Sequence, residues 1–176
     1  MQRIIIFEGP DRCGKSNIAQ ELSKRLDIPY FKNKRESKFF KADPGYFVKA
    51  LKYADPYFIS YLQQTKASII LDRSFPSEWV YSQAFNRETN LDILRMVDGL
   101  YAGIGAKIII PTRKDYALCS PDQFEEIDKE MLVKLDGLYT DFESWTSCET
   151  KRINVDDEDL ERELSEIMPF LEGSED

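Results

Sequence analysis

The segment Gly9–Ser16 matches the phosphate-binding pattern G-x-x-x-x-G-K-[ST] at every fixed position. Before it, residues 3–7 form a short apolar run that is typical of a buried strand. After it, residues 17–26 repeat apolar side chains at helical spacing. This order of strand, loop and helix is the context in which the pattern binds phosphates. The sequence therefore predicts a site for a nucleoside triphosphate at the amino-terminal end of an α/β fold.

Each fixed position of the loop has its own task. Gly9 and Gly14 allow tight turns that bring backbone N–H groups against phosphate oxygens. Lys15 supplies a positive charge, and Ser16 supplies a hydroxyl group for Mg²⁺. The helix that follows adds unpaired N–H groups and the positive end of its dipole. We expect the ATP phosphates to contact Gly9, Pro10, Cys13, Gly14, Lys15, Ser16 and Asn17.

The rest of the sequence alternates apolar runs with helical patterns. Strands are predicted at residues 3–7, 28–31, 68–72, 106–110 and 151–155, with Pro111 ending the fourth. Helices are predicted at residues 17–26, 43–53, 55–66, 76–85, 91–101, 121–145 and 156–171. Apolar strands alternating with helices indicate a three-layer α/β/α fold with a five-stranded parallel sheet. We expect one domain over residues 1–176, with a short lid at about 112–121.

A second motif, Asp72-Arg73, follows the third predicted strand. A carboxylate at the end of a strand beside the phosphate loop is placed to hold Mg²⁺ together with Ser16. The guanidinium fork of Arg73 suits a second phosphate group. The alternative is a helix-capping Asp72 with an exposed arginine. Because ligands of parallel sheets bind beyond the carboxyl ends of the strands, the loop, this pair and the lid are expected at one rim.

The composition limits the possible partners. The net charge of −8 disfavours a broad nucleic-acid surface. Five cations between Lys32 and Lys41, interleaved with aromatic residues, form one basic segment that suits either solvent or a DNA strand. No apolar stretch approaches the roughly 20 residues that span a bilayer. The first residues lack the pattern of a signal peptide, and the three cysteines are irregularly spaced, so we expect a cytoplasmic protein.

The motifs together resemble those of the thymidylate kinase and deoxynucleoside kinase superfamily of P-loop kinases. The residues that carry this resemblance are Phe7-Glu8-Gly9, the pair Asp11-Arg12 inside the loop, Asp72-Arg73-Ser74, and Ile153 to Asp156 before an acidic helix. The resemblance implies ATP and Mg²⁺ as cofactors. It also implies that Lys15 and the loop hold the donor phosphates, with Ser16 and Asp72 on the metal.

The resemblance assigns further roles around the acceptor. Arg12 would lie across the phosphoryl group in transfer, and Asp11 would accept a hydrogen bond from the sugar 3′-hydroxyl. Arg73 would hold the acceptor phosphate. The predicted lid departs from this pattern because it is not arginine-rich, and it offers only Arg113 and Lys114 to the nucleotide. Related enzymes are commonly dimers, so a homodimer is expected by resemblance.

Other residues differ from the thymidylate kinase pattern. No arginine occurs between Arg35 and Arg73, so the residue that grips the base is not identified. The stretch from Asp72 to Tyr81 also resembles phage-type deoxynucleotide kinases, which suggests that Glu78 and Tyr81, on one helix face, touch the acceptor. Alternatively, Glu78 is an ordinary first-turn carboxylate of its helix.

These observations favour Mg-ATP-dependent phosphoryl transfer to a deoxynucleoside monophosphate, either dTMP or a modified deoxypyrimidine monophosphate. One alternative is a deoxynucleoside kinase, for which Glu36 is the candidate general base. If the acceptor is instead a monophosphate, Arg35 beside it would bind the acceptor phosphate. Another is a kinase of a hydroxymethylated base in DNA, which the net charge disfavours. The last alternative is a nucleotide-binding switch without catalysis, like a GTPase. The absence of the Asn-Lys-x-Asp guanine signature from the sequence disfavours it.

Overall fold

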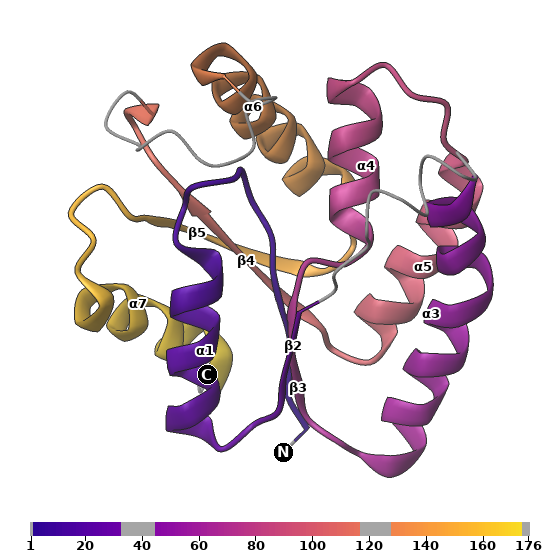
Figure 1. Cartoon of the computed structure of the whole chain (residues 1–176). Helices are drawn as coiled ribbons and strands as arrows, with labels where there is room; N and C mark the ends of the chain where they lie inside the picture. Colours follow the sequence, from indigo (N-terminus) through magenta and orange to yellow (C-terminus); the bar gives the residue numbers. More distant parts are fainter. Residues whose placement is uncertain (1, 33–44, 117–127, 174–176) are drawn as a thin grey trace.

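The computed structural model describes residues 2–32, 45–116 and 128–173. Within them the chain forms a sheet of five strands and six helices (Figure 1). The strands are β1 (Ile4–Phe7), β2 (Tyr30–Lys32), β3 (Ile69–Asp72), β4 (Lys107–Thr112) and β5 (Glu149–Asn154). The helices are α1 (Lys15–Leu26), α3 (Tyr46–Thr65), α4 (Phe75–Ala84), α5 (Leu91–Gly103), α6 (Lys129–Trp145) and α7 (Leu160–Glu172).

The sheet has the strand order β2-β3-β1-β4-β5, and every neighbouring pair is parallel. All carboxyl ends of the strands therefore lie at the same edge. The register at that edge places Asp72 of β3 between Phe7 of β1 and Lys32 of β2. This edge carries the residues of the candidate site.

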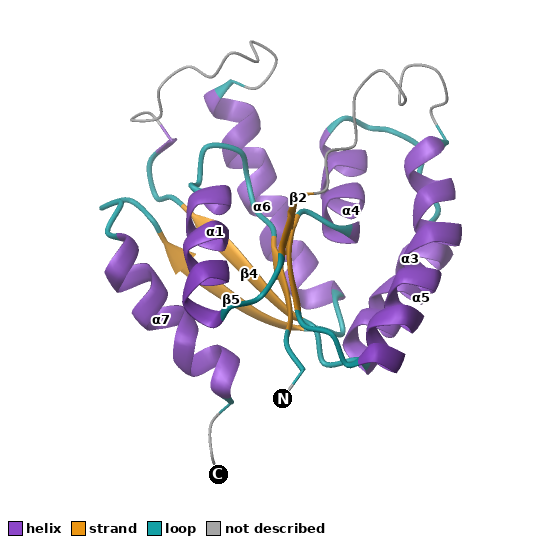
Figure 2. Ribbon diagram, turned by 60° about the horizontal axis from the view of Figure 1, so that its bottom comes forward, coloured by secondary structure: helices purple, strands orange, loops and turns teal. Residues whose placement is uncertain are grey.

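Helices cover both faces of the sheet, which confirms the predicted three-layer α/β/α arrangement (Figure 2). Side chains of β1 alternate between the two layers, because successive residues of a strand point to opposite faces. Ile5 and Phe7 pack with α1 and α7, whereas Ile4 and Ile6 pack with α3, α4, α5 and α6. All four side chains are buried, as expected for the central strand of a sheet covered on both faces.

The prediction of two helices at 43–53 and 55–66 is wrong, because α3 runs unbroken from Tyr46 to Thr65 with Pro56 inside it. Its buried residues lie on both sides of the proline, with Leu51 before it and Ile59 and Leu62 after it. Packing of this common face against the core holds the two halves in one helix despite the missing backbone donor. Residues 43 and 44 lie outside the described part of the chain.

Pro111 does not end β4, which continues to Thr112. The oxygen of Ile109 accepts a hydrogen bond from Glu8 N, so the backbone of Pro111, two residues later, faces the same side. The pairing of β1 with β4 ends at Phe7 and Ile109. No residue of β1 therefore needs a backbone N–H from Pro111. On the other side, β5 pairs with β4 through Thr112.

Two helix starts also differ from the prediction. Helix α6 begins at Lys129, where the side chain of Asp128 accepts a hydrogen bond from Met131 N at 2.8 Å. The predicted start at 121 lies outside the described residues. Helix α7 begins at Leu160 rather than at residue 156, because Asp159 is its N-cap. The other predicted elements are confirmed with small shifts at their ends.

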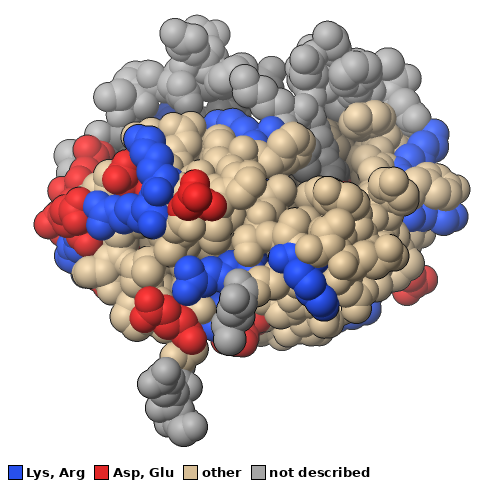
Figure 3. All heavy atoms as spheres, turned by 90° about the horizontal axis from the view of Figure 1, so that it is seen from below, with Lys and Arg blue, Asp and Glu red and all other residues tan. Residues whose placement is uncertain are grey.

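None of the described helices is long and apolar enough to pass through a bilayer. The face opposite the site is seen in Figure 3, where basic and acidic side chains are interspersed and no continuous basic patch is visible.

Candidate active site

The loop before α1 has a backbone that only glycine permits at Gly9. Its φ is +136°, and a Cβ atom there would lie 2.8 Å from the oxygen of Pro111. Gly14 has φ +64° and is the N-cap of α1, so the helix begins directly after the loop at Lys15. The first turn of α1 carries no acidic residue. The positive end of the helix therefore faces the loop, which favours an anion there.

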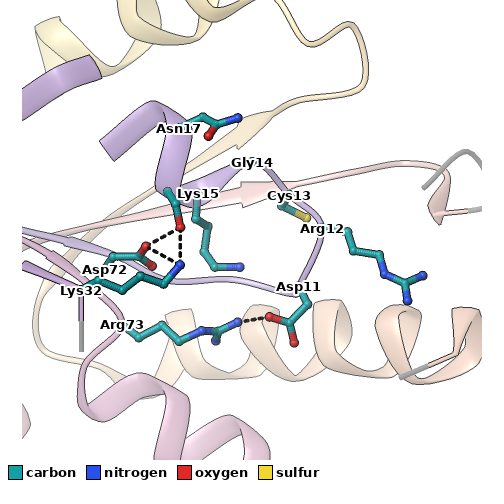
Figure 4. A pocket seen from close by; sticks show the side chains of 10 residues that line it. Asp11, Arg12, Cys13, Gly14, Lys15, Asn17, Lys32, Asp72 and Arg73 are labelled. Atoms are coloured by element: carbon teal, nitrogen blue, oxygen red, sulfur yellow. Dashed lines mark hydrogen bonds and ion pairs between the residues drawn. The ribbon is translucent and has the colours of Figure 1, made fainter. Parts of the chain in front are cut away.

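The loop borders a pocket of about 220 Å³, lined by residues 11–17 together with Lys32, Asp72 and Arg73. Four lining side chains are cationic and two are carboxylates, so the pocket has a formal charge of +2 although the chain carries −8. Figure 4 shows Lys15, Lys32 and Arg73 reaching into the same space from three different elements. A small, positively charged pocket of this kind suits a phosphorylated ligand.

Lys15 is the most buried cation of the pocket, with only 7% of its surface exposed. Its ammonium group donates a hydrogen bond to the oxygen of Pro10 in the same loop. Burial and the neighbouring charge of Arg73 lower the pKa of Lys15 from 10.5 to about 8. The negative charge of Asp11 offsets this lowering only in part, and a phosphate in the pocket would add to the offset.

Ser16 and Asp72 lie together, as predicted for the metal side of the site. The Ser16 hydroxyl donates to Asp72 Oδ2 at 2.5 Å, and the Tyr30 hydroxyl donates to the same oxygen at 2.7 Å. Burial acts to raise the pKa of Asp72, but these two hydrogen bonds and the charge of Lys32 lower it. One hydroxyl and one ionised carboxylate fit Mg²⁺, which prefers oxygen ligands and takes its others from phosphates and water. Ser16 and Asp72 are therefore the residues that would hold the ion.

Arg73 and Asp11 form an ion pair across the pocket (Figure 4). Tyr81 joins them, since its hydroxyl donates to Asp11 Oδ2 at 2.8 Å and accepts from Arg73 Nη2 at 3.2 Å. Burial would raise the pKa of Asp11, but the charges of Arg73 and Lys15 lower it. Arg73 has a left-handed backbone with φ 73°, which is uncommon for a non-glycine residue, and it shares this conformation with Arg12 in the same pocket.

Glu8 lies beside Arg73, and the sequence analysis names it in a motif but assigns it no role. Its side chain is fully buried and lies 3.9 Å from an Arg73 nitrogen. It accepts hydrogen bonds from the backbone of Ser74 at 2.5 Å, from Ser77 Oγ at 2.7 Å and from the Tyr139 hydroxyl at 2.9 Å. Burial raises the pKa of Glu8 more than Arg73 and the hydrogen bonds lower it. Glu8 thus ties the end of β1 to the start of α4.

The segment after β4 also reaches the loop. Arg113 Nε donates to the oxygen of Arg12 at 3.1 Å, and its Nη2 lies 2.7 Å from Glu158. The thiol of Cys13 lies 3.7 Å from the Tyr116 hydroxyl. The prediction that the loop, Asp72-Arg73 and the lid share one rim is thus confirmed as far as Tyr116. Residues 117–121 of the predicted lid lie outside the described part.

The remaining predicted site residues are placed as follows. Arg12 lines the pocket with a left-handed backbone, φ 66°. Glu78 does not line the pocket; it is 4% exposed and pairs with Arg87 Nη2 at 3.0 Å. Glu78 and Tyr81 therefore have different partners despite their helical spacing. Arg35 and Glu36 lie outside the described residues.

Lys32 is a second residue of the site that sequence reasoning missed. It lines the pocket and contacts both Ser16 and Asp72. In the sequence it belongs to the basic segment that continues to Lys41, which gives no reason to separate it from its neighbours. The available signal was its position at the end of a strand, which in a parallel sheet points to the ligand edge.

No protein-family model and no curated protein sequence matches this chain. Solved structures, however, match along almost its whole length. The YorR protein of Bacillus subtilis, solved with phosphorylated GDP, is 21% identical with a TM-score of 0.62, over 96% of this chain and 94% of that one. The thymidylate kinase of Ehrlichia chaffeensis is 14% identical with a TM-score of 0.58, over 98% and 99%. Deoxyadenosine kinase of M. mycoides, with dCMP and dCDP bound, is 22% identical with a TM-score of 0.58, over 96% and 98%. The chain therefore has the fold of the thymidylate and deoxyadenosine kinases, as its motifs predicted.

Proposed function

We propose that the protein transfers the γ-phosphoryl group of Mg-ATP to a deoxynucleoside monophosphate, dTMP or a modified deoxypyrimidine monophosphate. The observation that carries the proposal is that one small pocket gathers cations from separate segments of the chain beside Ser16 and Asp72. Lys15 reaches into it from the start of α1, and Arg73, which follows β3, reaches into it beside Asp11. Two phosphorylated ligands that react with each other need more than one cation within the same pocket.

In this proposal the residues act by binding and orientation. Lys15 and the loop N–H groups hold the donor phosphates, and Ser16 and Asp72 hold Mg²⁺. When bound, the ion neutralises charge on the phosphates. Arg73 holds the acceptor phosphate, while Arg12 and Arg113 are the arginines available to the group in transfer and to the nucleotide.

The reaction itself requires little from the protein beyond this arrangement. An oxygen of the acceptor monophosphate forms a bond to the γ-phosphorus, and the bond from that phosphorus to the bridging oxygen of ADP breaks. ADP leaves with the electron pair. The attacking oxygen is already ionised at neutral pH, so no general base is needed.

A nucleoside 5′-hydroxyl would instead need a base to take its proton. Both carboxylates that line the pocket, Asp11 and Asp72, have a lowered pKa and each is held by partners, which makes them weak bases. Among the described residues the pocket thus favours a monophosphate acceptor over a nucleoside. Glu36, the base considered for nucleoside phosphorylation, lies outside those residues.

The test is an acceptor panel. The purified protein is incubated with Mg-ATP and separate nucleosides, deoxynucleoside monophosphates and hydroxymethylated DNA, and ADP release and phosphorylated products are measured. We expect turnover with a deoxypyrimidine monophosphate and a diphosphate product. Turnover only with nucleosides or only with DNA would replace the proposal by the corresponding kinase. Hydrolysis of ATP at the same rate with every acceptor, and without a phosphorylated product, would contradict the proposed kinase activity and support a nucleotide-binding switch.

Two variants connect the result to the pocket. Asp72→Asn should abolish turnover. Arg73→Gln should raise KM for the acceptor while ATP affinity stays within about twofold, since Arg73 is assigned to the acceptor. Lys24→Met is the control, because Lys24 is 74% exposed and remote from the pocket lining. Equal losses in all three variants would point to general damage rather than to assigned roles.

A further inference from the structure

Lys32 already places a positive charge at the two residues that we assign to the metal ion. It is the last residue of β2, and the register of β2 and β3 sets it beside Asp72. Its ammonium group donates to Ser16 Oγ at 2.8 Å and lies 3.5 Å from Asp72 Oδ2 (Figure 4). The ammonium group of Lys32 therefore already occupies the contacts to Ser16 and Asp72 that a bound cation would make.

Burial does not lock Lys32 in this position. Its side chain is 45% exposed, whereas that of Asp72 is 2% exposed. The carboxylate is therefore held by the fold, and the ammonium group is a partner attached to a flexible stem. A half-exposed lysine can exchange one anionic partner for another, because its head group stays close to water throughout.

Charge explains why a cation belongs there. Asp72 Oδ2 receives hydrogen bonds from Ser16 and Tyr30, so it is already set as an acceptor, and the carboxylate is ionised at neutral pH. With Lys32 in contact, the carboxylate is neutralised in the nucleotide-free protein. A divalent ion arriving alone would have to displace that charge, and Lys32 would gain no new partner.

The geometry points to Lys32 as a tethered competitor of the divalent ion at Ser16 and Asp72. In the nucleotide-free protein it weakens binding of the metal alone. When metal and nucleotide arrive together, the phosphates offer the ammonium group another anion, so the exchange becomes favourable. This inference rests on the proposed function in so far as it takes Ser16 and Asp72 as metal ligands. Its consequence is that the protein takes up the metal with the nucleotide rather than before it.

The size of the effect follows from the contact distance. The half-exposed head group of Lys32 is screened by water. Under such screening, the attraction between two unit charges 3.5 Å apart corresponds to a factor of roughly five to ten in a binding constant. Removing the Lys32 charge should therefore strengthen binding of a divalent ion to the nucleotide-free protein by about that factor.

The experiment measures Mn²⁺ binding without nucleotide, from the electron paramagnetic resonance signal of the free ion. Four single variants, and the double variant that combines Asp72→Asn with Lys32→Met, are compared with the wild type. Lys32→Met removes the charge and keeps the stem, and Lys32→Arg keeps a charge. Lys24→Met removes an exposed lysine of α1 and thus changes the net charge equally. Asp72→Asn removes the proposed ligand, and thermal melting confirms that each variant is folded.

We expect Lys32→Met to bind Mn²⁺ about five- to tenfold more tightly than the Lys24→Met control. Lys32→Arg should resemble the wild type, and combining Asp72→Asn with Lys32→Met should cancel the gain. Equal affinities of Lys32→Met and Lys24→Met would overturn the inference, and so would the absence of measurable Mn²⁺ binding to Lys32→Met. Because no acceptor or turnover is involved, failure of the kinase proposal in the acceptor panel is a separate result.

Discussion

Replacement of Glu8 by alanine should destabilise the protein strongly, although the residue lies outside the pocket lining. The side chain is completely buried and accepts from Ser74 N and from the buried hydroxyl of Tyr139. Leaving two buried donors without an acceptor costs about 1–3 kcal/mol each, hence about 2–6 kcal/mol together. Part of this loss is offset, because the variant no longer buries a carboxylate whose pKa burial has raised. We expect a net loss of about 3–4 kcal/mol in the free energy of unfolding, a large share of the 5–15 kcal/mol that is usual for a domain.

Urea denaturation measures this loss directly, and the melting temperature should fall by about 6–16 °C for a chain of this size. Glu8→Gln is the matched control, because it keeps the volume and one acceptor oxygen for Ser74 N. It should lose clearly less than the alanine variant. If Glu8→Ala loses less than about 1 kcal/mol, or if both variants lose the same amount, the hydrogen bonds of Glu8 do not stabilise the fold as argued.

The free energy of unfolding of the wild type, compared with that of Glu8→Gln, should depend on pH with a definite sign. The folded pKa of Glu8 lies above its ordinary value of 4.5, so the folded state binds the proton more tightly than the unfolded chain. The stability that protonated Glu8 provides is present below pH 4.5 and is lost as the pH rises through the raised pKa. Glu8→Gln does not titrate. The stability difference between wild type and Glu8→Gln should therefore narrow as the pH rises, and a widening gap would contradict the assignment of burial as the dominant cause.

Three further predictions concern the pocket and the core. ATP affinity should fall by up to about tenfold per pH unit above pH 8, because Lys15 then loses its charge; calorimetry in buffers of different ionisation heat should show proton uptake on binding. Asp98→Ala should lower the free energy of unfolding by about 2–4 kcal/mol in urea denaturation without changing ATP affinity, since Asp98 is fully buried and accepts from Thr146 far from the pocket lining. Arg73→Lys should raise KM for the acceptor by at least about tenfold in steady-state assays, because an ammonium group cannot bind Asp11 and an acceptor phosphate with one planar fork.

Features that depend on consecutive residues are predictable from this sequence. The loop Gly9–Ser16 is one, because its turns and its helix start need particular residues at fixed spacing. The order of the parallel elements is another, since each strand is a short apolar run. The prediction fails at two of the prolines. Pro56 and Pro111 normally interrupt regular structure, but here the packing of α3 and the end of β1 remove the penalty.

The parts of the site that the sequence does not disclose are those set by strand neighbours. Glu8 directly follows a predicted strand, but its partners Ser77 and Tyr139 come from α4 and α6, far away in sequence. Lys32 stands in a basic segment, and only the parallel pairing of β2 with β3 brings it to Asp72. The short edge strand β2 thus ends in a lysine, and the neighbouring strand β3 ends in the carboxylate that we assign to the metal ion. This pairing places a cation within reach of that carboxylate before any ligand arrives, and this is the arrangement by which we propose that uptake of the metal is coupled to uptake of the phosphates.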